Sequence, residues 1–277
     1  MVEDNLNLPL ITVAICCYNG GRYLERTINS VLAQDYLNVE LVVVDDGSSD
    51  DTRKIIERFA SRNKSIRAFF RNNHGLPVSR NFAFSQAKGK WIAIIDQDDL
   101  YYPTRLSRQV EIAQRHPTAG FVFCNVHHID ESDQVIGDYL SVYTLPDSFI
   151  PKGDAGNLLL RLGCFSASVS CLIKRETVQS VGAFSESFPY ACDYDFFIRA
   201  GFGVDFAYTS DCLAAWRRHS EQATSTYRKR DLEIRSVLWC HWHGDKVSRR
   251  TKLMLPAKIF RAFIGEMTRK VGRQFRH

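Results

Sequence analysis

The feature that most constrains this chain is a repeated alternation of short apolar runs and helix-like segments over roughly its first half. The apolar runs are continuous rather than alternating, as in Leu10–Cys17, Val39–Asp45 and Trp91–Ile95. Strands of this kind are buried on both faces, which is typical of a parallel sheet covered by helices on both sides. We therefore predict an α/β fold with a Rossmann-like, mostly parallel sheet flanked by helices.

The individual elements follow from hydrophobic periodicity and from helix start and stop signals. The predicted strands span Leu10–Cys17, Val39–Asp45, Ser65–Phe70, Trp91–Ile95 and Phe121–Val126. The predicted helices between them span Arg22–Gln34, Asp50–Arg62, Val78–Ala87 and Pro103–His116. Residues 130–163 are less regular and are interpreted as hairpins and loops. Further on we predict a helix at Asp193–Ala200, short strands at Val204–Tyr208 and Cys212–Trp216, and helices at Tyr227–His243 and from about Thr251.

Polar and acidic residues follow three of the predicted strands. The first strand is followed by Cys17–Gly20, the second by Asp45–Asp50 and the fourth by Asp96–Asp99. In open parallel sheets ligands bind outside the carboxyl ends of the strands, so these segments should meet at one edge. Ser49 and Asp50 can equally be explained as the cap of the next helix. Three acids within Asp96–Asp99 exceed what capping needs and indicate a cation site.

An Asp-x-Asp turn can direct both carboxylates at one pocket. Hard cations such as Mg²⁺ and Mn²⁺ prefer oxygen ligands, and they often bind one or two carboxylates together with substrate phosphates. A diphosphate held in this way becomes a better leaving group, because the metal stabilises the charge that develops on it. The sequence therefore predicts a metal-assisted reaction on a nucleotide diphosphate.

Four motifs, taken in order and spacing, resemble those of family-2 glycosyltransferases: Ala14–Asn19, Val44–Thr52, Ser79–Asn81 and Ile95–Asp99. The resemblance covers about residues 8–220, and four motifs in order are far more specific than any one alone. It implies the GT-A fold and an inverting transfer of sugar from a nucleotide-diphosphate sugar to an acceptor hydroxyl. The Gln-x-x-Arg-Trp signature of processive members is absent, which favours a single addition.

The resemblance also implies roles for individual residues of the donor site. Tyr18, Asn19 and Asp46 match positions that line the base and ribose pocket. Arg80 matches a basic residue near the nucleotide, although it can also be explained as a surface residue of a helix. Asp96 matches the acid that faces the ribose, and Asp98 the acid that binds the metal.

A second pair of segments, Val181–Glu186 and Asp193–Arg199, resembles the family's acceptor site. By this resemblance Asp193 is the general base that removes the proton of the acceptor hydroxyl, although an acid at a helix N-terminus is also favoured by the helix dipole alone. Asp195 is interpreted as structural. The sequence departs from the family at Cys192, where Glu is usual, and at Cys17, where Pro is common.

Histidines supply one further metal candidate. Ala215–Ser220 resembles the family's late Arg-x-His segment, which implies that His219 joins the metal or the diphosphate, and Arg217 or Arg218 can neutralise diphosphate charge. His127 and His128 would point to opposite faces of a strand. His241 and His243 have no acidic or cysteine neighbour in the sequence, so neither pair predicts a metal site.

We expect a glycosyltransferase domain at residues 1–220, with a nucleotide-sugar half at about 8–126 and an acceptor half at about 127–220, followed by C-terminal helices at 221–277. The segment 246–277 holds ten Lys/Arg and one acid, a local charge of +9, whereas the whole chain carries +5. Apolar and basic residues recur at helical spacing from Leu253 to Phe275, which favours an amphipathic tail on an anionic membrane. A helix packed on the domain remains the alternative, and nothing accompanies the tail that is typical of nucleic-acid binding.

The same features bear on location and partners. The eight cysteines include no Cys-x-x-Cys pair, which fits a reducing compartment. The N-terminus lacks the pattern of a signal peptide, and no apolar run approaches the length of a spanning helix. We expect a cytoplasmic protein, peripheral at the inner face of the cell membrane, with a glycan or lipid-linked acceptor and no nucleic acid partner.

Two other functions remain open on the sequence alone. A sugar nucleotidyltransferase usually has a glycine-rich basic loop after the first strand, which Cys17–Arg22 matches only faintly. The second alternative is a protein that binds a nucleotide sugar or a glycan and catalyses weakly. It stays open because Cys192 departs from the acceptor-site pattern.

Overall fold

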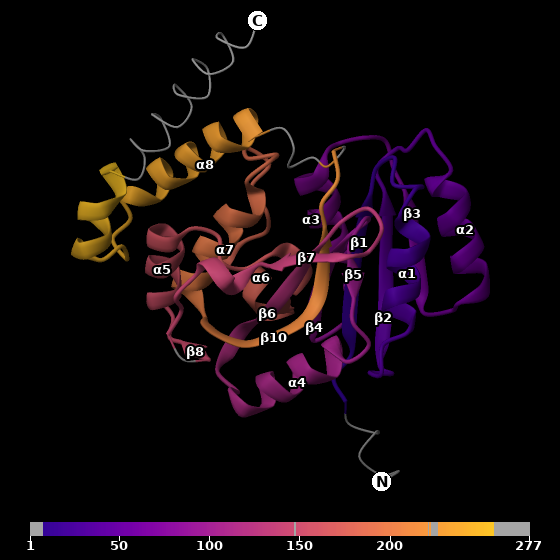
Figure 1. The fold of residues 1–277 in the computed structure, drawn as a ribbon, viewed down its shortest axis with the longest axis horizontal. Helices are drawn as coiled ribbons and strands as arrows, with labels where there is room; N and C mark the ends of the chain where they lie inside the picture. Colours follow the sequence, from indigo (N-terminus) through magenta and orange to yellow (C-terminus); the bar gives the residue numbers. More distant parts are fainter. Residues whose placement is uncertain (1–7, 147, 221, 223–226, 258–277) are drawn as a thin grey trace, which may run out of the picture.

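The structure is a computed structural model that describes residues 8–146, 148–220, 222 and 227–257. Its first half alternates strands and helices as predicted, with boundaries within two or three residues of the expected ones (Figure 1). The elements are β1 (Ile11–Cys17), α1 (Leu24–Leu32), β2 (Val39–Asp45), α2 (Thr52–Arg62), β3 (Ile66–Phe70), α3 (Leu76–Gln86), β4 (Trp91–Asp96), β5 (Leu100–Tyr101), α4 (Arg105–Arg115) and β6 (Ala119–Ile129).

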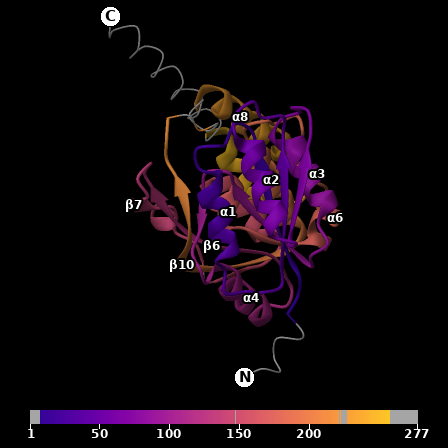
Figure 2. The same cartoon turned by 90° about the vertical axis from the view of Figure 1, so that its right-hand side faces the viewer.

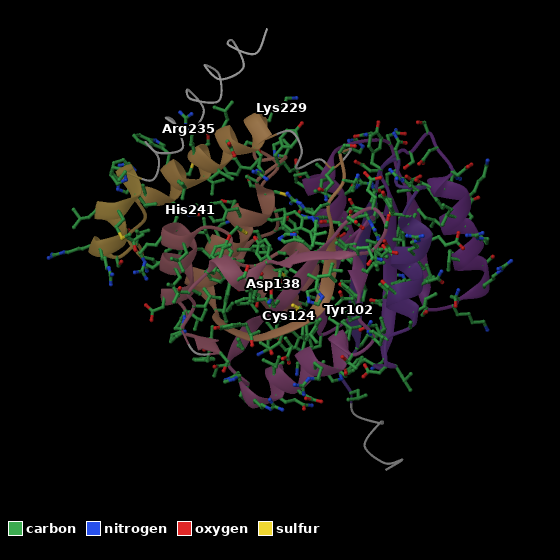
Figure 3. The ribbon with its side chains drawn as sticks, in the orientation of Figure 1. Tyr102, Cys124, Asp138, Lys229, Arg235 and His241 are labelled. Atoms are coloured by element: carbon green, nitrogen blue, oxygen red, sulfur yellow. The ribbon has the colours of Figure 1, made fainter. Side chains whose placement is uncertain are left out.

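The second half returns to the same sheet. Its strands are β7 (Val135–Asp138), β8 (Phe149–Ile150), β9 (Leu172–Lys174) and β10 (Asp205–Arg217). Its helices are α5 (Asp154–Leu162), α6 (Arg175–Val181), α7 (Cys192–Gly203) and α8 (Tyr227–Trp242), with short 3₁₀ turns at Leu140–Val142 and Ser168–Ser170. Figure 3 marks Asp138 on β7, together with Tyr102 after β5 and Cys124 on β6 from the first half.

One sheet holds all the strands of the described residues, in the order β3-β2-β1-β4-β9-β6-β10-β5, with β7 paired to β6 and β8 to β10. The pairs β3–β2, β2–β1, β1–β4 and β6–β10 are parallel. β9 lies antiparallel between β4 and β6 and joins the two parallel parts. The predicted α/β fold is therefore confirmed, with the parallel ladder interrupted at β9.

Both faces of the sheet are buried, because successive residues of a strand point to opposite sides. Ile11, Val13 and Ile15 of β1 pack in one cluster with residues of α1, α2 and α4, whereas Ala14 packs in a second cluster with residues of α3, α5 and α7. Figure 2 shows helices on both sides of the strands. This arrangement explains why the strands are continuous apolar runs, since neither face meets water.

Two expectations for the second half were wrong. The segment interpreted as hairpins and loops contains the nine-residue helix α5, whose Leu159 and Leu160 are fully buried. The two short strands expected at Val204–Tyr208 and Cys212–Trp216 are one continuous strand, β10. The residues between them resemble a turn, but they stay in the strand because the register of its pairing with β6 shifts at this point, as in a β-bulge.

The C-terminal region follows the prediction in part. The predicted helix at Tyr227–His243 is α8, and residues 249–257 are also helical. α8 packs on the rest of the chain through Val237 and Leu238, which are both buried. Most of the amphipathic tail predicted from Thr251 onwards lies outside the described residues.

Asp195 ties α7 to α8 and corrects one expectation from the sequence. Its carboxylate accepts hydrogen bonds from Arg199 Nε and His241 Nε2, both at 2.9 Å, so His241 does have an acidic partner in space. Burial alone would raise the pKa of Asp195, but the bonds and charges of His241 and Arg199 outweigh it and lower that pKa. Asp195 is thus structural, as predicted.

Two general properties concern compartment and membrane. All eight cysteines fall within the described part of the chain, and each has a free thiol. Within the described ranges, no helix is both long enough and apolar enough to cross a bilayer.

Candidate active site

The predicted acidic segments do meet at one edge of the sheet. In the register of the parallel ladder, Cys17 of β1 pairs with Asp45 of β2, and Cys16 pairs with Asp96 of β4. The loops that leave these three strands therefore start side by side. The sequence prediction of a shared edge is confirmed.

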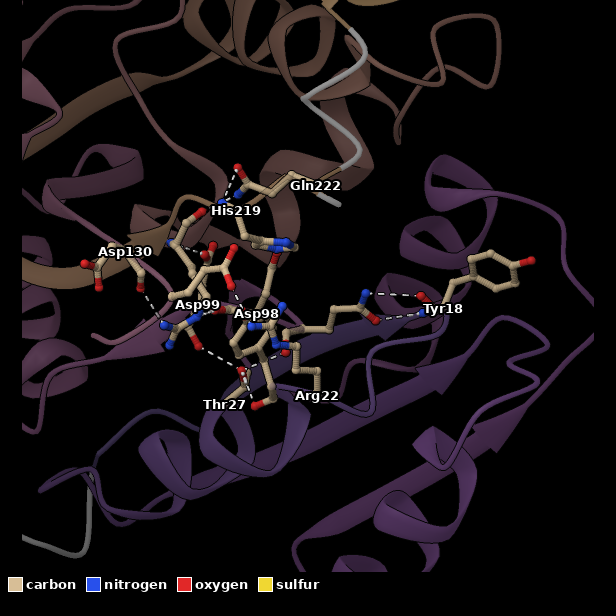
Figure 4. Close-up of polar contacts among 12 residues, drawn as sticks. Tyr18, Arg22, Thr27, Asp98, Asp99, Asp130, His219 and Gln222 are labelled. Carbon is tan, nitrogen blue, oxygen red and sulfur yellow. Dashed lines mark hydrogen bonds and ion pairs between the residues drawn. The ribbon is translucent and has the colours of Figure 1, made fainter. Parts of the chain in front are cut away.

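Hydrogen bonds between side chains and backbone join these loops. Asn19 adopts a left-handed conformation with φ of 49°, which asparagine tolerates better than most residues. Its amide oxygen accepts the N–H of Ser49 at 2.8 Å, and its own N–H donates to Ser48 Oγ at 2.9 Å. Gln97 bonds both the N–H and the C=O of Tyr18, whose side chain remains half exposed (Figure 4).

Asp46 also lies at this edge, but its carboxylate is directed at a neighbouring backbone. Its two oxygens accept the N–H groups of His74 at 3.0 Å and Gly75 at 2.8 Å. Gly47, with φ of 81°, makes a tight turn, and a Cβ on it would lie 2.8 Å from the N of Asn73. Asp46 therefore fixes the loop ahead of α3, the helix that carries Arg80.

Arg80 is buried, with a side chain 2% exposed, so it is not the surface residue that was the alternative. One of its guanidinium nitrogens lies 2.6 Å from Asp96 Oδ1, and another pairs with Asp193 Oδ1. Burial alone would lower the pKa of Arg80, but the charges of Asp193 and Asp96 raise it well above its usual value. Arg80 therefore joins the predicted donor-side acid to the predicted base.

Asp193 lies in the first turn of α7, and each of its carboxylate oxygens has a partner. Oδ1 pairs with Arg80 and accepts the Cys192 thiol at 3.7 Å, whereas Oδ2 accepts a hydrogen bond from the Ser168 hydroxyl. Burial and the charge of Asp193 raise the pKa of the Cys192 thiol well above its usual value, so the thiol stays protonated. The usual glutamate is thus replaced by a neutral, buried group.

The Asp98–Asp99 turn is held from both sides, as Figure 4 shows. Thr27 of α1 donates to the carbonyl of Asp99 at 2.9 Å. Arg217, fully buried at the end of β10, donates from its backbone N–H to Asp99 Oδ1 and from Nε to the carbonyl of Asp98, both at 2.9 Å. Burial and the charges of Asp98 and Asp96 raise the pKa of Asp99 well above its ordinary range.

Asp98 and His219, the two predicted metal ligands, come together although they lie 121 residues apart in the sequence. Asp98 Oδ2 lies 2.7 Å from His219 Nε2, with side chains only 17% and 8% exposed. The His219 ring also packs against Tyr23, with ring centroids 5.2 Å apart. Among the described residues, no group of three or more His, Cys, Asp and Glu side chains is placed to hold a metal ion.

A cavity of about 330 Å³ lies beside these residues. It is bordered by Asp96, Asp99 and Asp193, and on its α8 side by Arg230 and Ile234. Five aromatic residues also line it: Tyr139, Tyr143, Tyr190, Tyr194 and Trp216. The hydroxyls of Tyr139, Tyr143 and Tyr194 donate to the backbone carbonyls of Cys164 and Leu159. These three hydroxyls are therefore already engaged by the protein.

Sequence reasoning identified the acids of this site but missed Ser168, Gln97 and the aromatic lining. Ser168 lies in a 3₁₀ turn, without the periodic pattern by which helices and strands are detected. In the Asp-x-Asp pattern, Gln97 is only the residue between the two acids, and the pattern predicts no contact for it. A serine 25 residues from the predicted base has no local signal that would connect the two.

Comparisons with known proteins bear on the family of the chain. A sequence model of glycosyl transferase family 2 matches residues 12–180. An uncharacterized glycosyltransferase of Rickettsia felis is 30% identical over 244 residues, which is 85% of this chain but only 38% of the relative. One from Rickettsia typhi is 29% identical over 245 residues, covering 86% of this chain and 73% of the relative. The chain thus spans well under half of the longer relative and most of the shorter one.

Solved structures show the same fold at low sequence identity. S. aureus TarS, in complex with UDP-GlcNAc, has a TM-score of 0.69 at 18% identity, over 92% of this chain and 73% of that one. The mannosyltransferase PcManGT from Pyrobaculum calidifontis, in complex with GDP-Man and Mn²⁺, has a TM-score of 0.67 at 20% identity, over 92% and 70%. The mixed α/β sheet is therefore the GT-A fold that the sequence predicted. By its sequence match, its motifs and its fold, the chain belongs to glycosyltransferase family 2.

Proposed function

We propose that the chain is an inverting, metal-dependent glycosyltransferase that moves one sugar from a nucleotide-diphosphate sugar to an acceptor hydroxyl. The observation that carries the proposal is the bridge made by Arg80. It links Asp96, on the donor side, to Asp193, and both acids border one cavity. A donor and an acceptor that met there would react within reach of a carboxylate base.

Asp193 is proposed as that base. The acceptor oxygen attacks the anomeric carbon while its proton passes to the Asp193 carboxylate, and the bond from carbon to the diphosphate oxygen breaks. Attack opposite the leaving group inverts the anomeric centre. Arg80 and Ser168 hold the carboxylate in place, so its orientation is fixed before the acceptor arrives.

The residues present fit a divalent cation. A carboxylate oxygen and an imidazole nitrogen already lie 2.7 Å apart at Asp98 and His219. Such cations commonly complete their coordination with substrate phosphates and water, so two protein ligands suffice. When bound, the cation would stabilise charge on the departing diphosphate. We propose Mn²⁺ or Mg²⁺ as this cation.

The donor is proposed to lie along the loops after β1, β2 and β4, which hold Tyr18, Asn19, Asp46 and Asp96. TarS and PcManGT, which share the fold, are solved with UDP-GlcNAc and with GDP-Man. These complexes support a nucleotide sugar as the donor class. The aromatic lining of the cavity supports a glycan or lipid-linked acceptor, because pyranose rings and apolar chains both pack on aromatic faces.

A screen of UDP-, GDP- and dTDP-sugars with and without Mn²⁺ tests the function. The right donor should raise the melting temperature only when the metal is present. At 100 times Kd the gain is about 2.7 kcal/mol, or roughly 5–10 °C for a chain of this size. The same donor should release nucleoside diphosphate slowly, with water taking the place of the acceptor.

The alternatives give different outcomes in this screen. Release of pyrophosphate from a nucleoside triphosphate and a sugar phosphate would indicate a nucleotidyltransferase. Binding of a donor without any turnover would indicate a binding protein. If no sugar nucleotide bound with either metal, the proposed donor site would be wrong.

We further propose that the C-terminal region contacts an anionic membrane, at the cytoplasmic face, where a lipid-linked acceptor would be found. Within the described residues, Lys246, Arg249 and Arg250 are exposed, and so are the apolar side chains of Trp239 and Leu253. Basic residues beside exposed apolar ones are typical of interfacial segments. The more basic segment beyond residue 257 lies outside the described residues.

Sedimentation with phosphatidylcholine vesicles, with and without phosphatidylserine, tests this contact. The double variant Arg249→Glu/Arg250→Glu should weaken binding to the anionic vesicles by at least about 30-fold, since each basic residue near the surface contributes about 1 kcal/mol. The matched control Arg62→Glu/Lys64→Glu makes the same charge change at the exposed end of α2. Equal losses in both variants would show that net charge, and not this region, is responsible.

A further inference from the structure

The turn that carries Asp193 is held by a residue far along the chain. α7 starts after Ala191 and has no capping side chain of its own. The N–H groups at a helix start have no partner within the helix and need one elsewhere. Glu233 of α8 provides it, because its Oε2 accepts the N–H of Tyr190 at 2.7 Å and the N–H of Ala191 at 2.9 Å.

A second hydrogen bond joins α8 to α7 itself. Eight residues further along α8, His241 Nε2 bonds Asp195 Oδ1 at 2.9 Å. Between the two contacts, Val237 and Leu238 are buried against the domain. The two helices are neighbours in Figure 1, and Figure 3 marks the course of α8 from Lys229 to His241. Asp193 lies between the two bonded sites, so α8 holds the chain through the backbone before Asp193 and through the Asp195 side chain after it.

The same face of α8 reaches the cavity. Arg230 and Ile234 border it, and they lie three residues before and one residue after Glu233. Arg230 shares a face of the helix with both Glu233 and Ile234, because these two residues lie three and four positions after it. The helix that holds the turn before Asp193 therefore also forms a wall of the cavity. α8 lies beyond residue 180, where the match to the family model ends.

We propose that Glu233 is a positioning residue for Asp193, and that α8 is thereby part of the active site. The inference rests on the proposed function, because it assigns Glu233 a role only if Asp193 is the base. Cys192 is neutral and buried, so Glu233 is the carboxylate that bonds the backbone just ahead of the base. Without its two hydrogen bonds the first turn of α7 would lose its anchor, and Asp193 would shift relative to the anomeric carbon.

Variants at Glu233 separate the effect of its side-chain length from the effect of its charge. Glu233→Gln keeps an oxygen at the same distance and should lose no more than about threefold in kcat, whereas Glu233→Asp keeps the charge but is one methylene too short. Glu233→Asp and Glu233→Ala should lower kcat by about 10–100-fold, because small misplacements of a reacting group are costly. The donor KM should not change, since Glu233 bonds none of the donor-side loops. Ser236→Ala, at an exposed position of the same helix, is the matched control.

The measurement is release of nucleoside diphosphate from the donor found in the screen, with Mn²⁺, corrected for folded protein by the melting curve. Absence of donor turnover in the wild type would contradict the proposed function rather than this inference. A kcat in Glu233→Asp equal to that of the wild type would overturn the inference. A Glu233→Gln variant as slow as Glu233→Asp would overturn it too, because the length of the side chain would then not matter. If Glu233→Ala does not fold, the other two variants still decide.

Discussion

Replacing Asp193 by asparagine should lower kcat by about 10²–10⁴-fold, which is the usual contribution of a general base. Asparagine has nearly the same shape and can still accept from Arg80, but it cannot take up the acceptor proton. Donor affinity should be unchanged, because the loops after β1 and β2 are untouched. The measurement is nucleoside diphosphate release at saturating donor and Mn²⁺, with donor affinity followed by calorimetry.

Asp154→Asn is the matched control for this substitution. Asp154 is an exposed acid in the first turn of α5, just as Asp193 is an acid in the first turn of α7. If Asp193 served only the helix dipole, both variants would lose about 0.3–1 kcal/mol of stability and keep their activity. Full activity in Asp193→Asn would therefore remove the base from the mechanism.

Asp98→Ala should be the second severe variant. Loss of a metal ligand removes several kcal/mol of charge stabilisation on the leaving diphosphate, and each 1.36 kcal/mol is tenfold in rate, so we expect a fall of about 10³-fold. Calorimetry should also show that donor binding no longer depends on Mn²⁺. Asp51→Ala, an exposed acid paired with Lys54 at the start of α2, is the control and should behave as wild type.

Two observations would contradict the metal site. Wild-type turnover that is unaffected by a chelator would show that no cation takes part. Turnover in Asp98→Ala equal to that of the wild type would show that the cation, if needed, binds elsewhere. His219→Ala should act in the same direction as Asp98→Ala, because its Nε2 faces the Asp98 carboxylate.

The first half of the fold could be predicted because its signals are local. β1, β2 and β4 are apolar runs buried on both faces, and each ends in a polar motif. The second half lacks such signals. β9 has only three residues, and in β10 the sequence Thr209–Cys212 resembles a turn although the strand continues through it. Burial and pairing against β6 override the local preference there.

The site divides in the same way. The acids of Asp96–Asp99 were found because they are consecutive at a strand end. Their partners were not, because they come from distant parts of the chain: Ser168 is 25 residues from Asp193, and Glu233 is 43 residues from Tyr190. His241 was set aside for want of an acidic neighbour, yet Asp195 lies against it in space, 46 residues earlier in the chain.

The end of β10 has a consequence for the order of events. Trp216 borders the cavity, whereas the next residue, Arg217, grips the Asp98–Asp99 turn, and His219 follows two positions later. Adjacent side chains on a strand face opposite ways, so β10 contacts the cavity on one side and the Asp98–Asp99 turn on the other. If the proposed donor binds at this turn, we expect it to order the Trp216 side chain as well. We therefore expect the nucleotide sugar to bind before the acceptor.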